Sequence, residues 1–281
     1  MDVADVTDII ELMLMVQMGT LDIDVSAERR VETERARDIL GRIVAGRTLT
    51  RREVHDALPS RTVVLFRMGP PRLWGYAVEQ RLPADAKDFA PSAIKDDPTG
   101  PFTDATEAWL GWHITDASHV DRLETHTDRF DGDPTAEDND RYQRLRLGMS
   151  LADPVGQVWS SARGHWSIKP ETEYIVPSRY GWCPYVFRIP EGGWRRDSFE
   201  GHRDRFMATR GLWIDIANDR LVEMGAPDKN NAWRPTMTVS DQPLTDTDRQ
   251  VATLLTDEVI ALGPAGKNPI IRLRQRGRRL Y

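Results

Sequence analysis

Apolar residues dominate one short stretch near the start of the chain, from Ile9 to Met18, and this stretch predicts a buried helix. It is too short to cross a membrane, which takes roughly 18 or more consecutive apolar residues. It also follows Asp2, Asp5 and Asp8, where a signal peptide has cations. We therefore expect this helix to pack against the rest of the protein.

Two further helices are predicted before residue 59. The first is expected to begin after a cap at Ser26 and to end at Gly46. Its apolar positions mostly follow a step of three to four residues and are Val31, Ile39, Leu40, Ile43 and Val44. The spacing Thr50-Arg-Arg-Glu53 is that of a capping box and predicts the next helix, with Val54 and Leu58 facing inward. Residues 1–59 are therefore expected to form a helical N-terminal region.

A pair of strands is predicted next, at Thr62–Phe66 and Leu73–Val78, on either side of a turn at Gly69–Pro71. Paired helices followed by a strand hairpin have the order of a winged helix, which would continue to residue 80. Many ordinary α+β domains share that order, so both interpretations stay open. Beyond a polar stretch, Glu107–Ile114 predicts another strand, and residues 60–145 are expected to be a mixed strand and loop region.

The second half of the chain predicts a helix at Arg141–Leu151, an amphipathic helix at Thr245–Ile260 and a closing strand at Pro269–Arg274. One face of the amphipathic helix is formed by Val251, Leu254, Leu255 and Val259. Helices at the start and strands with peripheral helices afterwards predict the α+β class.

Composition narrows the possible functions. The chain has 40% hydrophobic and 29% charged residues, as soluble globular proteins do, and its net charge of −6 argues against indiscriminate binding of nucleic acid. Acidic residues gather in 116–140, whereas the stretch after Gly263 has no acidic side chain. That stretch contains Lys267, Arg272, Arg274, Arg276, Arg278 and Arg279. One cysteine, Cys183, excludes an internal disulfide and fits a reducing cytoplasm, where we expect an inert core thiol.

Half of the aromatic residues lie between Trp159 and Trp213, interleaved with arginines. Aromatic rings stack on nucleobases for roughly 1–3 kcal/mol per base, and arginines neutralise phosphates. This pattern favours a nucleic-acid-binding surface. The alternative is that the rings form the core of a small barrel and the arginines form its rim.

The same region resembles the domains of the PUA and EVE superfamily over about residues 155–275. The resemblance rests on Arg163-Gly-His-Trp166, Glu173–Val176, Gly181–Ile189 and Gly266-Lys-Asn-Pro-Ile-Ile-Arg272. It implies a PUA/EVE-like barrel domain at residues 146–281, in which Arg163–Trp166 belong to a strand. It also implies a pocket where a modified or flipped base is held between rings. The region from Arg210 to Asp257 is longer than the family pattern.

These observations predict a cytoplasmic, non-catalytic reader of nucleic acid, DNA in preference to RNA. We expect recognition of a modified base, a role in defence and a separate effector protein, without contact to a membrane. The expected pocket residues are Trp159, Arg163, Trp166 and Trp182. The expected backbone contacts are Lys267, Asn268, Arg272 and Arg274.

Two alternatives stay open: a nucleotide or small-molecule enzyme that uses the same pocket, and an interaction or scaffold protein with an apolar patch on its first helix. No metal or cofactor is expected. The acidic and histidine residues of 116–128 favour a solvated surface, and Gly263–Asn268 departs from a P-loop. Ser150 lies in a near-match to a nucleophile elbow and is assigned a structural role.

Overall fold

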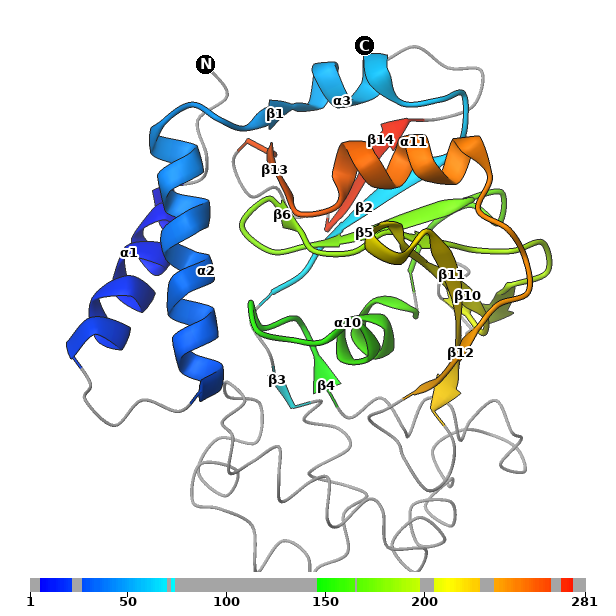
Figure 1. Cartoon of the computed structure of the whole chain (residues 1–281), viewed down its shortest axis with the longest axis horizontal. Helices are drawn as coiled ribbons and strands as arrows, with labels where there is room; N and C mark the ends of the chain where they lie inside the picture. Colours follow the sequence, from blue (N-terminus) through cyan, green and yellow to red (C-terminus); the bar gives the residue numbers. More distant parts are fainter. Residues whose placement is uncertain are drawn as a thin grey trace, which may run out of the picture.

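The computed structural model describes residues 6–21, 27–69, 72–73, 146–164, 166–197, 205–227, 235–263 and 269–274. Its helices are α1 (Val6–Leu21), α2 (Ala27–Val44), α3 (Arg51–Ala57), α10 (Val155–Ala162) and α11 (Asp246–Leu255), with a 3-10 turn η1 (Ile216–Asn218). Its strands are β1 (Leu49–Thr50), β2 (Val63–Arg67), β3 (Arg72–Leu73), β4 (Arg146–Leu147), β5 (Tyr174–Ser178), β6 (Trp182–Cys183), β7 (Phe187–Arg188), β8 (Trp194–Asp197), β9 (Arg205–Ala208), β10 (Gly211–Asp215), β11 (Arg220–Pro227), β12 (Pro235–Val239), β13 (Glu258–Ala261) and β14 (Ile270–Arg274). The fold is α+β, as expected (Figure 1).

A mixed seven-stranded sheet organises the described part of the protein, in the order β12-β11-β10-β7-β5-β2-β14. Strand β2 runs parallel to β5, and the other neighbours are antiparallel. Side chains of a strand alternate between its two faces. Val63 and Leu65 therefore join one core with α3 and α11, whereas Val64 and Phe66 join the other with α10.

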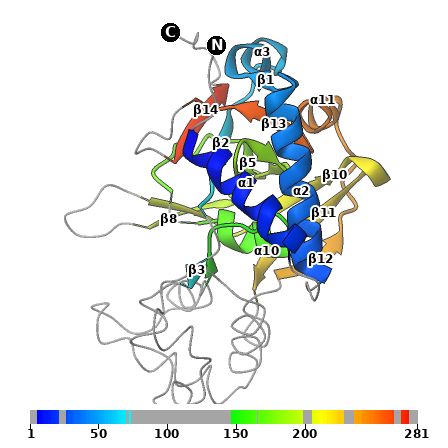
Figure 2. The same ribbon diagram turned by 90° about the vertical axis from the view of Figure 1, so that its left-hand side faces the viewer.

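The helices cover these two faces and one end of the sheet. In Figure 1, α3 and α11 lie above the sheet, α10 lies below it, and α1 and α2 stand side by side at the left. Strands β1, β13 and β6 form a small second sheet near α2. The hairpin of β8 and β9 projects from the body in Figure 2.

The N-terminal helices confirm part of the prediction. Helix α2 ends at Val44, and Gly46 follows with a φ of 65°, a left-handed conformation that glycine adopts without strain. The capping box of α3 forms in full: the Thr50 hydroxyl accepts from the Glu53 amide, and Glu53 accepts from the Thr50 amide. Hydrogen bonds from the Thr50 amide and hydroxyl to the Glu53 carboxylate hold the pKa of Glu53 below its usual range.

The expectation that the first helix is buried holds for only one of its faces. Leu12 is fully buried, and Met15 and Val16 pack against the same core. The opposite face is open, because Met13 and Leu14 are 55% and 51% exposed. None of the helices in the described ranges is long and apolar enough to cross a membrane.

The predicted pairing of the first two strands is wrong. Strand β2 has β14 on one side and β5 on the other, so neither side is left for a hairpin with residues 73–78. Its buried residues on both faces are typical of an internal strand. Because β2 belongs to the same sheet as the later strands, the boundary expected at residue 146 does not separate the strands of this sheet.

Two helix predictions also need correction. Residues 146–147 form β4 and a turn begins at Leu151, within the range 141–151 where a helix was expected. Helix α11 ends at Leu255, because Asp257 has a φ of 60° and breaks the helix. The β-branched Val259 and Ile260 then enter β13, where both are buried. The predicted strand at Glu107–Ile114 and the acidic segment 116–140 lie outside the described residues.

Candidate nucleic-acid interface

Trp166 lies where three elements meet. Its ring stacks on Phe66 of β2, with ring centroids 4.2 Å apart and planes inclined by 13°. Its indole Nε1 donates to the carbonyl oxygen of Ala162 at the end of α10 (2.6 Å). Its backbone exchanges two hydrogen bonds with Phe206 of β9, at 2.9 and 2.8 Å. The ring is thus fixed in place while it stays partly exposed. Among the described residues of 163–166, where a strand was expected, only Trp166 takes part in β pairing, as an isolated bridge to Phe206.

Arg272 lies on the same face of the sheet as this ring stack. In β14, Ile270 pairs with Phe66 and Arg272 pairs with Val64. Directly paired residues of antiparallel strands point to one face, and diagonal neighbours are about 7–8 Å apart. The Arg272 side chain is exposed and makes no hydrogen bond or ion pair with any residue in the described ranges. An aromatic ring stack and an exposed cation, far apart in sequence, therefore lie on one face of the sheet.

Trp159 and Arg163 are interior residues of the α10 region. Both are fully buried. Trp159 donates from Nε1 to the carbonyl oxygen of Gly225 (3.0 Å). Its ring fills the space in which a Cβ at Gly211 would stand, so glycine is required there. Arg163 donates from Nη1 to the carbonyl oxygen of Ala208 (3.3 Å) and so ties α10 to β9. These two side chains hold the α10 region against β11 and β9.

Trp182 lies at a different place, under helix α2. It is 4% exposed, and its Nε1 donates to Oδ1 of Asp257 (2.7 Å). The guanidinium of Arg35 lies 4.6 Å from the centroid of its ring and also donates to Asp257 Oδ1 (2.8 Å). The carbonyl oxygen of Asp257 accepts from Arg42 (2.7 Å). Trp182 therefore joins α2 to the turn before β13.

Arg274, the next expected contact to a nucleic-acid backbone, is engaged within the protein. Its Nη1 donates to the carbonyl oxygen of His55 on α3 (3.0 Å). A register shift between Arg272 and Arg274 separates the two side chains. Lys267 and Asn268 lie outside the described residues.

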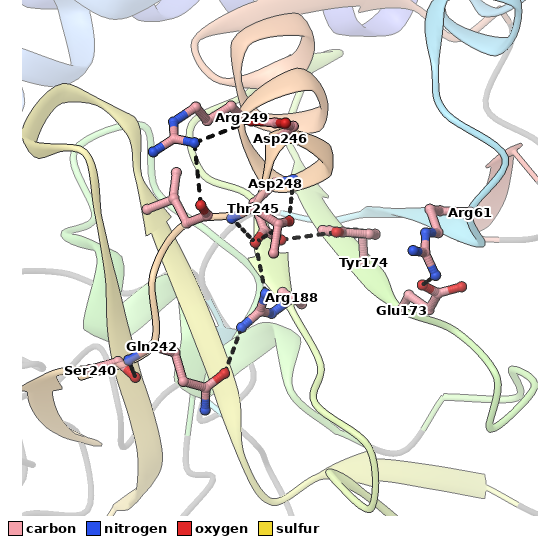
Figure 3. Close-up of polar contacts among 11 residues, drawn as sticks. Arg61, Glu173, Tyr174, Arg188, Ser240, Gln242, Thr245, Asp246, Asp248 and Arg249 are labelled. Atoms are coloured by element: carbon pink, nitrogen blue, oxygen red, sulfur yellow. Dashed lines mark hydrogen bonds and ion pairs between the residues drawn. The ribbon is translucent and has the colours of Figure 1, made fainter.

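A buried polar network on the opposite face of the sheet was not predicted from the sequence (Figure 3). Asp248, in the first turn of α11, is fully buried and accepts from Tyr174 (2.9 Å) and from Arg188 (2.7 Å). Its Oδ2 also accepts from the amide and hydroxyl of Thr245. Burial and the neighbouring Asp248 raise the pKa of Tyr174 far above its usual value. The spacing Thr245-x-x-Asp248, a capping box, was the available signal.

The described residues hold no group of three or more potential metal ligands, and the expected acidic cluster of 116–128 is outside them. Ser150 donates to Glu32 of α2, and its amide donates to Asp153 (2.7 Å). Ser150 and Asp153 are both 4% exposed. These contacts link α2 to the segment before α10, in line with the structural role assigned to Ser150.

Comparison with known proteins gives no match to a family model, to a curated protein or to a solved structure.

Proposed function

We propose that the protein binds nucleic acid by stacking a base on Trp166 while Arg272 contacts a neighbouring phosphate. The observation that supports this best is the shared sheet face of these two side chains. Stacking contributes roughly 1–3 kcal/mol per base, and each neutralised phosphate releases condensed counterions. The net charge of −6 restricts such binding to a local surface of this kind.

The contacts of Trp166 hold its ring in one orientation before a base binds, which favours stacking. Phe66 backs one side of the ring, and the Nε1 bond to Ala162 fixes its orientation. A ring already ordered in the free protein loses little conformational entropy on binding, which would otherwise weaken the affinity. Trp159 and Trp182, both interior, take part only by holding the elements around this surface.

The finer parts of the proposal rest on the resemblance described above. They are a PUA/EVE-like barrel, recognition of a modified or flipped base, a preference for DNA, and action in the cytoplasm with a separate effector protein. A flipped base costs a few kcal/mol to extrude, so a single stack on Trp166 favours strands that are already unpaired.

The first test is the affinity for fluorescently labelled single-stranded and duplex oligonucleotides, measured by anisotropy. Trp166→Ala should raise the Kd about 5- to 150-fold while the protein stays folded. Trp213→Ala is the matched control, because Trp213 is also partly buried but lies on β10 against Tyr185. Wild-type protein without measurable binding would defeat the proposal, as would equal losses for the two variants.

The second test is the salt dependence of that affinity. Arg272→Ala should flatten the slope of log affinity against log salt by about one unit, because one phosphate contact is removed. Arg52→Ala on α3 is the control, since the side chain of Arg52 is 91% exposed on another element. An unchanged slope for Arg272→Ala would remove β14 from the interface.

A further inference from the structure

Arg196 lies on strand β8, in a row of side chains that leads to Trp166. Phe206 of β9 pairs with Arg196 on one side and with Trp166 on the other, both times in antiparallel register. Directly paired residues of antiparallel strands point to the same face. The side chains of Arg196, Phe206 and Trp166 therefore share one face of this hairpin, and Arg196 is exposed there.

The hydrogen bonds of Phe206 set the spacing within this row. Its amide and its carbonyl oxygen both bond to Trp166, so its pair with Arg196 is of the non-hydrogen-bonded kind. The Cα atoms are about 5.5 Å apart in a hydrogen-bonded pair and about 4.5 Å apart in the other kind. The backbone of Arg196 therefore lies about 10 Å from that of Trp166, close enough for one bound strand of nucleic acid to touch both side chains.

Arg272 has a similar relation to the Trp166 ring, but through a different sheet. Phe66 of β2 stacks on the ring at 4.2 Å, and Arg272 of β14 is a diagonal neighbour of Phe66, about 7–8 Å away. Each exposed arginine is thus separated from Trp166 by one phenylalanine, Phe66 for Arg272 and Phe206 for Arg196. In Figure 2, β14 and the β8–β9 hairpin lie on the same side of the body. Two cations from separate sheets therefore border one ring.

We propose that Arg196 contacts a second phosphate of the strand whose base stacks on Trp166, so that the ligand is a single-stranded oligonucleotide and not a mononucleotide. This inference rests on the proposed function and adds a contact residue and a ligand class to it. The two arginines lie up to roughly 20 Å apart, with about half of that distance on each side of the ring. A strand of about four nucleotides or more is needed to touch both, and its bases must be unpaired to stack on the ring.

The guanidinium group of Arg196 has the chemistry for this contact. It presents five N–H donors in a planar fork that matches phosphate, so Arg196 keeps its existing contact within the protein and still has donors for a ligand. Its neighbour Arg195 pairs with Met207 and lies on the opposite face of the same hairpin. Arg195 is therefore a matched control, with the same charge on the same strand but away from Trp166.

The salt dependence of binding to labelled oligothymidylates tests the proposal. With strands of about 12 nucleotides, Arg196→Ala should flatten the slope of log affinity against log salt by about 0.7 unit and raise the Kd about 3- to 10-fold near physiological salt. Arg196→Lys keeps the charge and should retain the wild-type slope. Arg195→Ala should retain it as well, because its side chain lies on the other face. Unaltered melting shows that the variants are folded.

Strand length provides a second readout. Strands of about two nucleotides are long enough to stack on Trp166 but too short to extend to Arg196, so Arg196→Ala should leave their Kd, measured by competition, unchanged. If Trp166→Ala and Arg272→Ala weaken binding while Arg196→Ala equals the wild type on long strands, this inference is wrong and the proposed function stands. Equal losses for Arg195→Ala and Arg196→Ala also overturn it, in favour of a general effect of charge. A wild type that binds no oligonucleotide defeats the proposed function, and this inference with it.

Discussion

Asp248 and Arg188 form an ion pair of 2.7 Å between α11 and β7, although Asp248 is fully buried. The pair is tolerated because Tyr174 and Thr245 also donate to the Asp248 carboxylate, so its charge is well solvated by the protein. One carboxylate thus caps a helix and holds that helix to two strands of the sheet. Arg188 also donates from Nη2 to Oε1 of Gln242 (2.8 Å).

Asp248→Asn should lower the free energy of unfolding by about 3 kcal/mol, because Arg188 then lacks a counter-ion in a mostly buried position. Asp246→Asn is the matched control in the same helical turn. Its carboxylate is fully exposed, so we expect a loss below about 0.5 kcal/mol. Urea denaturation measures both, and similar losses for the two variants would contradict the role of the buried pair.

Two leucines of α1 allow a comparison within one helix. Leu12→Ala should destabilise the protein by about 2–4 kcal/mol, because it leaves a cavity in the core. Leu14→Ala, at a half-exposed position, should cost less than about 1 kcal/mol. Thermal melting of the two variants is the measurement. Equal effects would mean that α1 is not anchored through Leu12.

Asp257 accepts a hydrogen bond from Arg35 and so holds α2 against the turn before β13. Its backbone has a φ of 60°. Asp257→Ala should cost about 2 kcal/mol, since the buried Trp182 Nε1 loses its acceptor and alanine is strained at positive φ. Asp257→Asn keeps an acceptor and tolerates this backbone, so a loss of about 1 kcal/mol or less is expected. If asparagine were as costly as alanine, the charge of Asp257 and not its geometry would be the important property.

The stability should fall at alkaline pH. Burial raises the pKa of the Cys183 thiol to about 12, so the folded protein disfavours the thiolate that forms in the unfolded chain above about pH 9. The contribution is therefore fully present below pH 9 and is lost as the pH rises towards 12. Between pH 9 and 10 the loss should be about 1 kcal/mol. In Cys183→Ala, the midpoint of urea unfolding should fall less steeply with pH over that interval than in the wild type. An unchanged slope would contradict the role given to the Cys183 thiol.

The features predicted correctly from the sequence depend on residues a few positions apart. The capping box of Thr50 and Glu53 and the helix end at Gly46 are local, and the backbone decides them. The pairing of β2 was not predictable in this way, because its partners lie more than a hundred residues further along the chain. The break at Asp257 was missed because an aspartate at positive φ has no strong sequence signal.

The candidate site shows the same limit. Trp159 and Trp166 have similar sequence surroundings, yet one fills the core behind Gly211 and the other lies partly exposed on Phe66. Only the packing of distant strands decides which ring faces outward. Arg272 and Arg274 are two positions apart, and a register shift sends one to open surface and the other to His55.

The position of β2 between β5 and β14 has a consequence for how the chain folds. The ribosome completes β2 long before it makes β14, whose residues Ile270–Arg274 come some 200 residues later, roughly 10–40 s at ordinary rates of synthesis. During that interval the edge of β2 that later pairs with β14 has no partner strand. Slow folding with high contact order and a need for chaperone protection during synthesis are the expected result.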